Sequence, residues 1–296
     1  MLGLELRDTV AVAVSVDDRG QVLARAEVEA GSDLSAAAVA ALDRVRAASS
    51  GPGGLGVASP NLDSAATLAV LRSLASRHAG PFLREAAVAS GTAAAVAEAW
   101  IGAARDVGDA VFFAVANHAT AGIVRNHVPV TGAHRRAPAI AWLALNPVER
   151  EDYRKVGCLE AEVAAAGIVR RLIWRIKAGD RSRVQDLVSG DLAAIALEQV
   201  LEAARGGDGV SISVVRDTAK YLGMAAANLV AIADPEMLVL GGIMASAADL
   251  FLEPVRTELA RRLPGPMMQA LAVAPALLGA DAAAIGAARL AASAPR

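Results

Sequence analysis

The chain opens with the stretch LGLELRDTVAVAVSVDDRGQVLARA, which covers residues 2–26. Over residues 10–30 two apolar, β-prone runs flank the turn DDRG at residues 17–20. A turn residue that tolerates positive φ between two such runs predicts a β-hairpin. A second pair of apolar runs, residues 110–116 and 121–126, is a candidate for another hairpin. Because strand and helix patterns alternate after each hairpin, the sequence predicts an α/β protein with two similar lobes.

The composition limits the kind of core and the kind of partner. Of the 296 residues 55% are hydrophobic but only 3% are aromatic, which predicts a core of Ala, Val and Leu with few large rings. The net charge of −2 provides no basic field, so direct nucleic-acid binding is not expected. The single cysteine, Cys158, excludes an intramolecular disulfide and a Cys-rich zinc site.

The sequence carries no signal for export or membrane insertion. The N-terminal residues MLGLELRDTV lack the basic region and apolar run of a signal peptide. No uninterrupted apolar run reaches about 18 residues, so no membrane span is expected. We therefore expect a soluble cytoplasmic protein.

The pattern divides the chain near residue 109. We expect an N-terminal lobe over residues 1–109, a C-terminal lobe over 110–281, and a C-terminal helix over 282–296 that could pack back on the N-terminal lobe. Apolar spacing in the second half also predicts strand character at 140–145 and helices over 160–177, 181–204 and 214–233.

Six segments in this order resemble the ROK family (repressor, open reading frame, kinase), whose kinases phosphorylate sugars with ATP. The resemblance implies the two-lobe actin/hexokinase-like (ribonuclease H-like) ATPase fold over essentially the whole chain. It also implies a homodimer formed through the second lobe. The segments are residues 2–26, 54–64 (GLGVASPNLDS), 93–100 (AAAVAEAW), 156–161 (VGCLEA), 234–242 (DPEMLVLGG) and 278–288 (LGADAAAIGAA).

The first hairpin has lost the residues that the resemblance assigns to ATP. Active members carry D-x-G-x-T there, because bare backbone must approach the phosphates. Here Glu5 keeps a carboxylate and Thr9 keeps a hydroxyl, but Arg7 and Asp8 occupy the two positions before Thr9, where the resemblance leads us to expect Gly. An acidic side chain beside phosphates repels them. We expect an ordinary solvated turn at this place.

The catalytic base of the family lies in an Asn-Asp-Ala-Asn segment, which corresponds here to residues 89–92, Ala-Ser-Gly-Thr. The base position is therefore Ser90, whose hydroxyl cannot accept a proton near neutral pH as a carboxylate can. Capping of the following helix by Ser or Thr is the structural role we expect. If a ligand still binds in a cleft, the candidate contact residues are Asn61, Ser90, Thr92 and Glu160.

The remaining nucleotide positions are in the second half of the chain. The Gly-rich phosphate loop of the family corresponds to residues 116–122, of which only Gly122 is still glycine. A loop with one glycine is not expected to wrap a triphosphate. Gly241 and Gly242 follow a predicted strand, where nucleotide-binding members pack the adenosine. The same pair is also needed for a tight strand-to-helix turn, so it supports the fold more than nucleotide binding.

The sugar and zinc motifs of the family are also reduced. The E-x-G-H motif corresponds to residues 139–142 (AIAW), which retain neither polar group, and His134 with Arg135 and Arg136 is either a partial substitute or a solvated basic turn. Residues 157–160 (GCLE) match the end of the zinc loop, but its earlier cysteine positions hold residues such as Asp152, Tyr153 and Lys155. We therefore expect no zinc. Glu160 is either a surviving sugar contact or an acid that the helix dipole favours.

The substituted positions therefore include the catalytic base, both phosphate loops, the Glu and His of the sugar motif and the zinc ligands. The first hypothesis is a catalytically degenerate ROK-fold protein that acts by binding a sugar-like small molecule or a partner, without a cofactor. The alternative is an active but divergent sugar kinase that uses ATP and Mg²⁺, with Glu98 or Asp109 as the base. A second alternative is a transcriptional regulator that lacks its DNA-binding domain.

Overall fold

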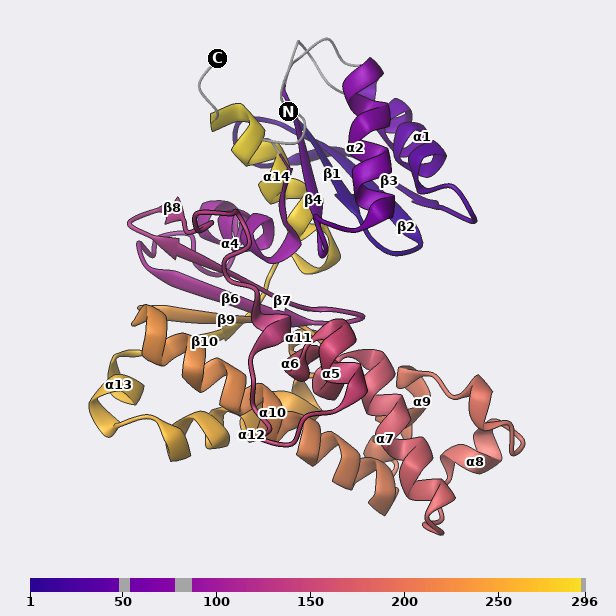
Figure 1. Cartoon of the computed structure of the whole chain (residues 1–296). Helices are drawn as coiled ribbons and strands as arrows, with labels where there is room; N and C mark the ends of the chain where they lie inside the picture. The colour runs from indigo at the N-terminus through magenta and orange to yellow at the C-terminus, as the bar shows by residue number, and fades with distance from the viewer. Residues whose placement is uncertain (48–53, 78–86, 294–296) are drawn as a thin grey trace. The chain divides into compact units, whose positions relative to one another are not determined.

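The computed structural model describes residues 1–47, 54–77 and 87–293. The chain forms two compact units (Figure 1). Unit 1 consists of residues 1–112, 120–138 and 276–296, and unit 2 consists of residues 113–119 and 139–275. Unit 1 therefore includes the segment of residues 120–138 and the segment that carries the last helix.

Unit 1 is built on a five-stranded sheet of order β3-β2-β1-β4-β5. Strand β2 pairs antiparallel with β3, as the hairpin pattern predicts, and also with β1, whereas β1, β4 and β5 are mutually parallel. The three parallel strands are therefore neighbours, and their carboxyl ends lie at one edge of the sheet. The strands are β1 (Leu2–Leu6), β2 (Val10–Val16), β3 (Val22–Glu29), β4 (Leu55–Ser59) and β5 (Ala87–Ala89).

Helices cover this sheet. Leu2, Leu4 and Leu6 of β1 pack in one core with apolar residues of α1 (Leu34–Arg46) and α2 (Ala65–Arg77). The last helix, α14 (Ala282–Ser293), packs against β1, β4 and α4 (Ser90–Ile101).

Glycine permits the close approach of α14 to the sheet. A Cβ at Gly56 would lie 1.8 Å from the carbonyl oxygen of Ala287, and a Cβ at Gly3 would lie 1.9 Å from that of Ala284. Backbone therefore meets backbone in this layer, and a larger residue has no room.

The second sheet has the order β10-β9-β6-β7-β8, and the division between the units passes through β6 and β7. Its outer strands pair in parallel (β9 with β10) and antiparallel (β7 with β8) fashion, so the sheet is mixed. The strands are β6 (Ala110–Val115), β7 (Ala119–Arg125), β8 (Val128–Pro129), β9 (Met237–Gly242) and β10 (Ala272–Pro275).

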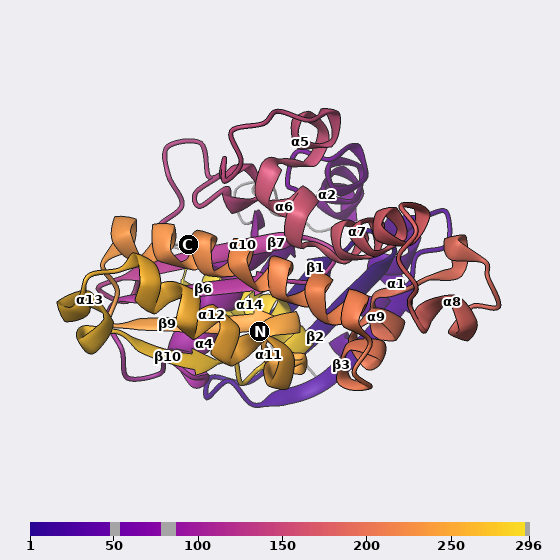
Figure 2. The ribbon, with the colours of Figure 1, turned by 90° about the horizontal axis from the view of Figure 1, so that it is seen from below.

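Unit 2 is otherwise helical. The long helix α10 (Gly209–Ala233) runs beside α12 (Ala248–Arg262), as Figure 2 shows, and Gly223 allows the approach because a Cβ there would lie 2.2 Å from that of Glu258. The other helices of the unit are α5 (Glu151–Val156), α6 (Cys158–Val163), α7 (Ala165–Lys177), α8 (Val184–Leu187), α9 (Leu197–Arg205), α11 (Ile243–Ser246) and α13 (Gly265–Ala270).

Three predicted elements are wrong in detail. Residues 140–145 form no strand, and a 3₁₀ turn, η1 (Ile140–Trp142), lies there with only Ile140 buried. The predicted helix 181–204 is interrupted after α8, because Ser189 and Gly190 both adopt positive φ and turn the chain, and a 3₁₀ turn (Leu192–Ala194) precedes α9. The predicted helix 160–177 breaks at Ala164, which is extended. Within the described part of the chain, no helix combines the length and apolarity needed to cross a membrane.

Candidate functional site

One edge of the sheet in unit 1 gathers three of the predicted site positions. Glu5 is near the end of β1, Asn61 follows β4, and Ser90 comes directly after β5. The register places Glu5 opposite Ala58 and Ser59 opposite Ala89, so these chain positions lie at similar heights. Ligands of open α/β sheets bind outside the carboxyl ends of parallel strands, and this edge has that geometry.

Glu5 is already paired within the chain. Its side chain is only 8% exposed, and the guanidinium of Arg7 donates to its carboxylate with Nη2 at 2.7 Å and Nε at 2.8 Å. Arg7 also donates to the carbonyl oxygen of Ala280, and its backbone N–H closes the turn onto Val10 at 2.9 Å. The cation at the expected Gly position therefore neutralises the carboxylate that would face a metal–phosphate group.

Asn61 organises its own loop. Its side-chain oxygen accepts from the backbone N–H of Asp63 at 3.1 Å, and its backbone N–H donates to Ser59 Oγ at 3.3 Å. Asp63 in turn forms an ion pair of 2.9 Å with Arg136. The loop after β4 is thus fixed by local hydrogen bonds and by one cation of the basic turn.

The basic turn of residues 134–136 is attached to unit 1. Arg135 Nη2 donates to the carbonyl oxygen of Ala87 in β5 at 2.7 Å, and Arg136 holds Asp63. His134 is exposed. Arg136 therefore contacts the loop after β4 at the candidate edge, and Arg135 contacts the first residue of β5.

Ser90 is buried, with 5% of its surface exposed, and its hydroxyl has no hydrogen-bond partner among the described residues. The expectation that Ser or Thr caps the helix is wrong, because α4 begins at Ser90, its N-cap is Ala89, and no side chain caps it. Thr92 is also buried, in the first turn. The turn fits closely against β7, since a Cβ at Gly91 would lie 2.2 Å from the carbonyl oxygen of Ala121.

The carboxylate of Glu98 in α4 is fully engaged. Oε2 accepts from the N–H of Ala103 at 2.7 Å, and Oε1 accepts from the N–H groups of Leu277 and Leu278 at 3.0 and 2.9 Å. Glu98 therefore connects α4 to the segment before α14. Asp109, the other alternative base, accepts from the N–H of Asn126 at 2.7 Å.

In unit 2, Glu160 pairs with His118, a contact that the sequence did not predict. Oε1 lies 3.2 Å from His118 Nδ1, and Oε2 accepts from the N–H of Ala119 at 2.9 Å. The two side chains are 13% and 27% exposed. Glu160 thus connects the first turn of α6 to the turn between β6 and β7, where the family has its Gly-rich loop. Its partner is 42 residues away, so no local pattern indicates the pair.

Two of the three predicted nucleotide glycines, Gly122 and Gly242, have packing roles. Gly122 is next to α4, and a Cβ there would lie 2.3 Å from the carbonyl oxygen of Gly91. Gly242 adopts a φ of +59°, and a Cβ there would lie 2.0 Å from the carbonyl oxygen of Val115. Gly241 precedes it at the end of β9. The strand-to-helix turn and the contact with β6 explain Gly242 without a nucleotide.

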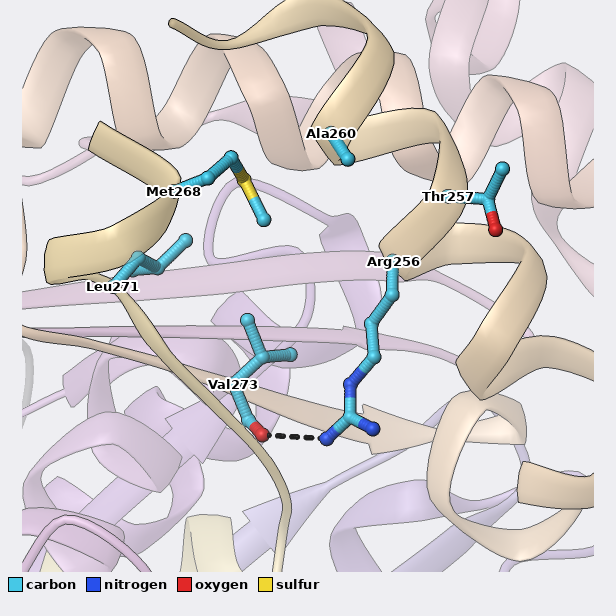
Figure 3. A pocket seen from close by; sticks show the side chains of 6 residues that line it. All are labelled: Arg256, Thr257, Ala260, Met268, Leu271 and Val273. Carbon is cyan, nitrogen blue, oxygen red and sulfur yellow. Dashed lines mark hydrogen bonds between the residues drawn. The ribbon is translucent and has the colours of Figure 1, made fainter. Parts of the chain in front are cut away.

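A cavity of 470 Å³ lies in unit 2 between α12, α13 and β10 (Figure 3). Arg256 lines the cavity and donates through Nη2 to the carbonyl oxygen of Val273 at 2.9 Å. None of the predicted site residues lines this cavity. The lining residues are Arg256, Thr257, Ala260, Met268, Leu271 and Val273.

Comparison with known proteins supports this architecture. The crystal structure of a ROK family glucokinase from Streptomyces griseus, in complex with glucose and AMPPNP, superposes with a TM-score of 0.80 at 23% identity over 98% of both chains. This match confirms the predicted actin/hexokinase-like fold.

Sequence relatives agree with the structural match. A glucokinase from Halalkalibacterium halodurans is 30% identical over 165 residues, 55% of this chain and 50% of the relative. The DNA-binding transcriptional dual regulator NagC from Escherichia coli is 27% identical over 164 residues, 55% of this chain and 39% of the relative. The chain thus spans half or less of the length of these curated relatives. The model of the ROK family matches residues 57–294, and the chain therefore belongs to the ROK family.

Proposed function

We propose that this ROK-family protein binds a sugar-like ligand and does not transfer phosphate to it. The observation that carries the proposal is the absence of an available base on the described part of α4. Ser90 is neutral where the family has its carboxylate, and both oxygens of Glu98 accept hydrogen bonds from backbone amides. A carboxylate committed to three donors is poorly suited to accept a proton from a sugar hydroxyl.

The residues at the predicted nucleotide-binding positions support the same proposal. The Glu5 carboxylate is paired with Arg7 at 2.7 Å, so a magnesium ion would have to displace a cation from a buried anion. The residues present do not fit ATP·Mg²⁺ at this hairpin. Gly122 and Gly242 have packing roles that need no phosphate.

A carbohydrate is the ligand class that the relatives favour. They include a glucokinase solved with glucose and proteins described as N-acetylglucosamine repressors. We propose Asn61, Ser90 and Thr92 as ligand contacts of unit 1 and, separately, Glu160 as a ligand contact of unit 2. His118 holds Glu160 and would have to move, or share it, when a sugar hydroxyl binds.

A thermal-shift screen tests the proposal, because a ligand that binds only the native state raises the melting temperature. The panel contains glucose, N-acetylglucosamine and other hexoses and amino sugars, together with ADP and ATP·Mg²⁺. Phosphate transfer is followed in parallel by ADP release. A shift with a sugar alone, without ADP release, is the expected result.

ATP-dependent phosphorylation of any sugar would refute the proposal if Ser90→Ala or Glu5→Ala abolishes it. That outcome would establish the divergent kinase instead. Glu29→Gln, an exposed carboxylate of β3, is the matched control and should change neither readout.

The similarity to NagC favours one second candidate, a sugar-responsive regulator. The net charge of −2 argues that DNA contact would come from a partner. We also propose that the protein acts as a homodimer, and light scattering tests this against the monomer mass of 30.1 kDa.

A further inference from the structure

The positions that the family resemblance assigns to zinc do not fit a zinc ion in this chain. Structural zinc needs four N or S donors. Trp142 replaces the histidine and is 58% exposed, and its indole N–H is a donor without a lone pair to give. Cys158 is a single thiol, buried beside Ala161 and Leu145.

The earlier cysteine positions are occupied by groups that already have partners. Asp152 is ion-paired with Arg150 and Arg170, and Lys155 is ion-paired with Glu151. Tyr153 donates its hydroxyl to Glu162. These positions therefore hold ion-paired and hydrogen-bonded side chains in place of the thiolates that a zinc ion would need.

Glu162 is the centre of these contacts. It is 2% exposed, and its Oε1 accepts from Arg150 Nη1 at 2.9 Å and from the Tyr153 hydroxyl. Its Oε2 lies 3.4 Å from Arg171 Nη1. One buried carboxylate therefore receives donors from the α5 segment and from α7.

Asp152 extends the network. It accepts from Arg150 Nη2 at 2.7 Å and lies 2.9 Å from Arg170 Nη1. The charges thus alternate along one chain, and Arg171 connects that chain to α10 through the hydroxyl of Thr218. We call this set the ionic cluster; its members are Arg171, Glu162, Arg150, Asp152 and Arg170.

Aromatic rings cover the ionic cluster. The ring of Trp174 lies 5.1 Å from the guanidinium carbon of Arg150 and 5.0 Å from that of Arg170. Asn146 donates to the hydroxyls of Tyr153 and Tyr221 at 3.3 and 3.5 Å, which fixes the loop before α5. Cation–π contacts of this kind add to charge pairing where water is partly excluded.

We infer that the ionic cluster holds α5 and α6 against α7 and α10 in place of a metal, and that Glu162 is the positioning residue for Glu160. Helix α6 has six residues and is too short to be stable without tertiary contacts. Glu160 and Glu162 both belong to α6, and they contact His118 and the ionic cluster respectively. The contacts of Glu162 therefore orient the helix so that Glu160 points toward His118. The part that concerns Glu160 as a ligand contact rests on the proposed function.

The only cysteine reports directly on this arrangement. Cys158 begins α6 and is 7% exposed, so its reaction with the thiol reagent DTNB measures how often α6 separates from its neighbours. In the full chain we expect slow labelling that EDTA and phenanthroline do not change. In Glu162→Gln we expect labelling at least about tenfold faster. Glu151→Gln removes an exposed ion pair of the same segment and is the matched control.

Proton NMR of the four histidines gives a second readout that needs no ligand. The ring signals of His118 are assigned by their loss in His118→Asn. We expect Glu162→Gln to move them in the same direction as Glu160→Gln does, and Glu162→Asp to restore them in part. If Glu162→Gln does not fold, Glu162→Asp and Arg150→Lys provide graded versions of the same change.

Three outcomes would overturn the inference. These are stoichiometric zinc in the purified protein, faster labelling of the wild type in the presence of chelator, and wild-type labelling and histidine signals in Glu162→Gln. Because neither readout uses sugar or ATP, failure of the proposed function would leave this result unchanged, and the two failures are distinguishable.

Discussion

Glu98→Ala should be among the most damaging single changes in unit 1. The carboxylate is 1% exposed and accepts three backbone N–H groups at 2.7–3.0 Å. Hydrogen bonds to a charged group contribute about 1.5–3 kcal/mol each, so three give about 4.5–9 kcal/mol if they add. Leu277 is 69% exposed, so water can replace part of the carboxylate there. A loss of about 3–4 kcal/mol in the free energy of unfolding is the expected result.

The Gln variant separates hydrogen bonding from charge. In Glu98→Gln the amide oxygen can still accept from Leu277 and Leu278, but its NH₂ group then faces the N–H of Ala103. We expect about half the loss of the Ala variant, since one of the three contacts becomes repulsive.

Urea unfolding followed by circular dichroism measures both changes, and the larger loss corresponds to a fall of about 6–8 °C in the melting temperature. Glu29→Gln is the exposed control and should stay within about 0.5 kcal/mol of the wild type. If Glu98→Ala also stays within about 1 kcal/mol, the carboxylate is not an anchor, and its candidacy as a base returns.

Three further changes test other features. Gly56→Ala places a Cβ 1.8 Å from the carbonyl oxygen of Ala287, so α14 must shift; urea unfolding should show a loss of at least about 2 kcal/mol. Ser90→Ala removes a buried hydroxyl that has no hydrogen-bond partner among the described residues. The free energy of unfolding should therefore stay the same or increase by up to about 1 kcal/mol, and the melting temperature should not fall. Burial opposes ionisation of Asp208, but hydrogen bonds from Arg183 and Ser211 outweigh it and lower its pKa below the ordinary 3.8. Its contribution to stability is full above that value and is lost as the pH falls through the folded-state pKa, so Asp208→Asn should flatten the acid side of a stability–pH profile.

The fold was predictable because its signals are local. The hairpin of residues 10–30, the strand of residues 237–240 and the final helix each follow from apolar spacing within one segment. The structure confirms them as β2 with β3, β9 and α14. The helix predicted over 181–204 was wrong because two residues with positive φ interrupt an otherwise helical pattern.

The site was less predictable because its contacts are distant in sequence. The resemblance identified Glu160 as a possible sugar contact, and Glu98 was one of two alternative bases, but their partners are 42 and about 180 residues away. Glu5 and Arg7 are only two residues apart, but the resemblance indicated only that a glycine is missing at residue 7. It did not predict that the Arg7 side chain would pair with Glu5. The prediction that Ser90 caps the helix was wrong because Ser90 is the first residue of α4, whereas a capping residue precedes the first turn.

The contact between α14 and the first sheet has a consequence for biosynthesis. β1 and β4 leave the ribosome early, but the helix that covers them starts at residue 282, more than 200 residues after the end of β4. At about 5–20 residues per second, roughly 10–45 seconds pass before that helix is made. During this interval the glycine-lined face of the nascent sheet is open to solvent, and a chaperone or a neighbouring nascent chain can occupy it before α14 arrives.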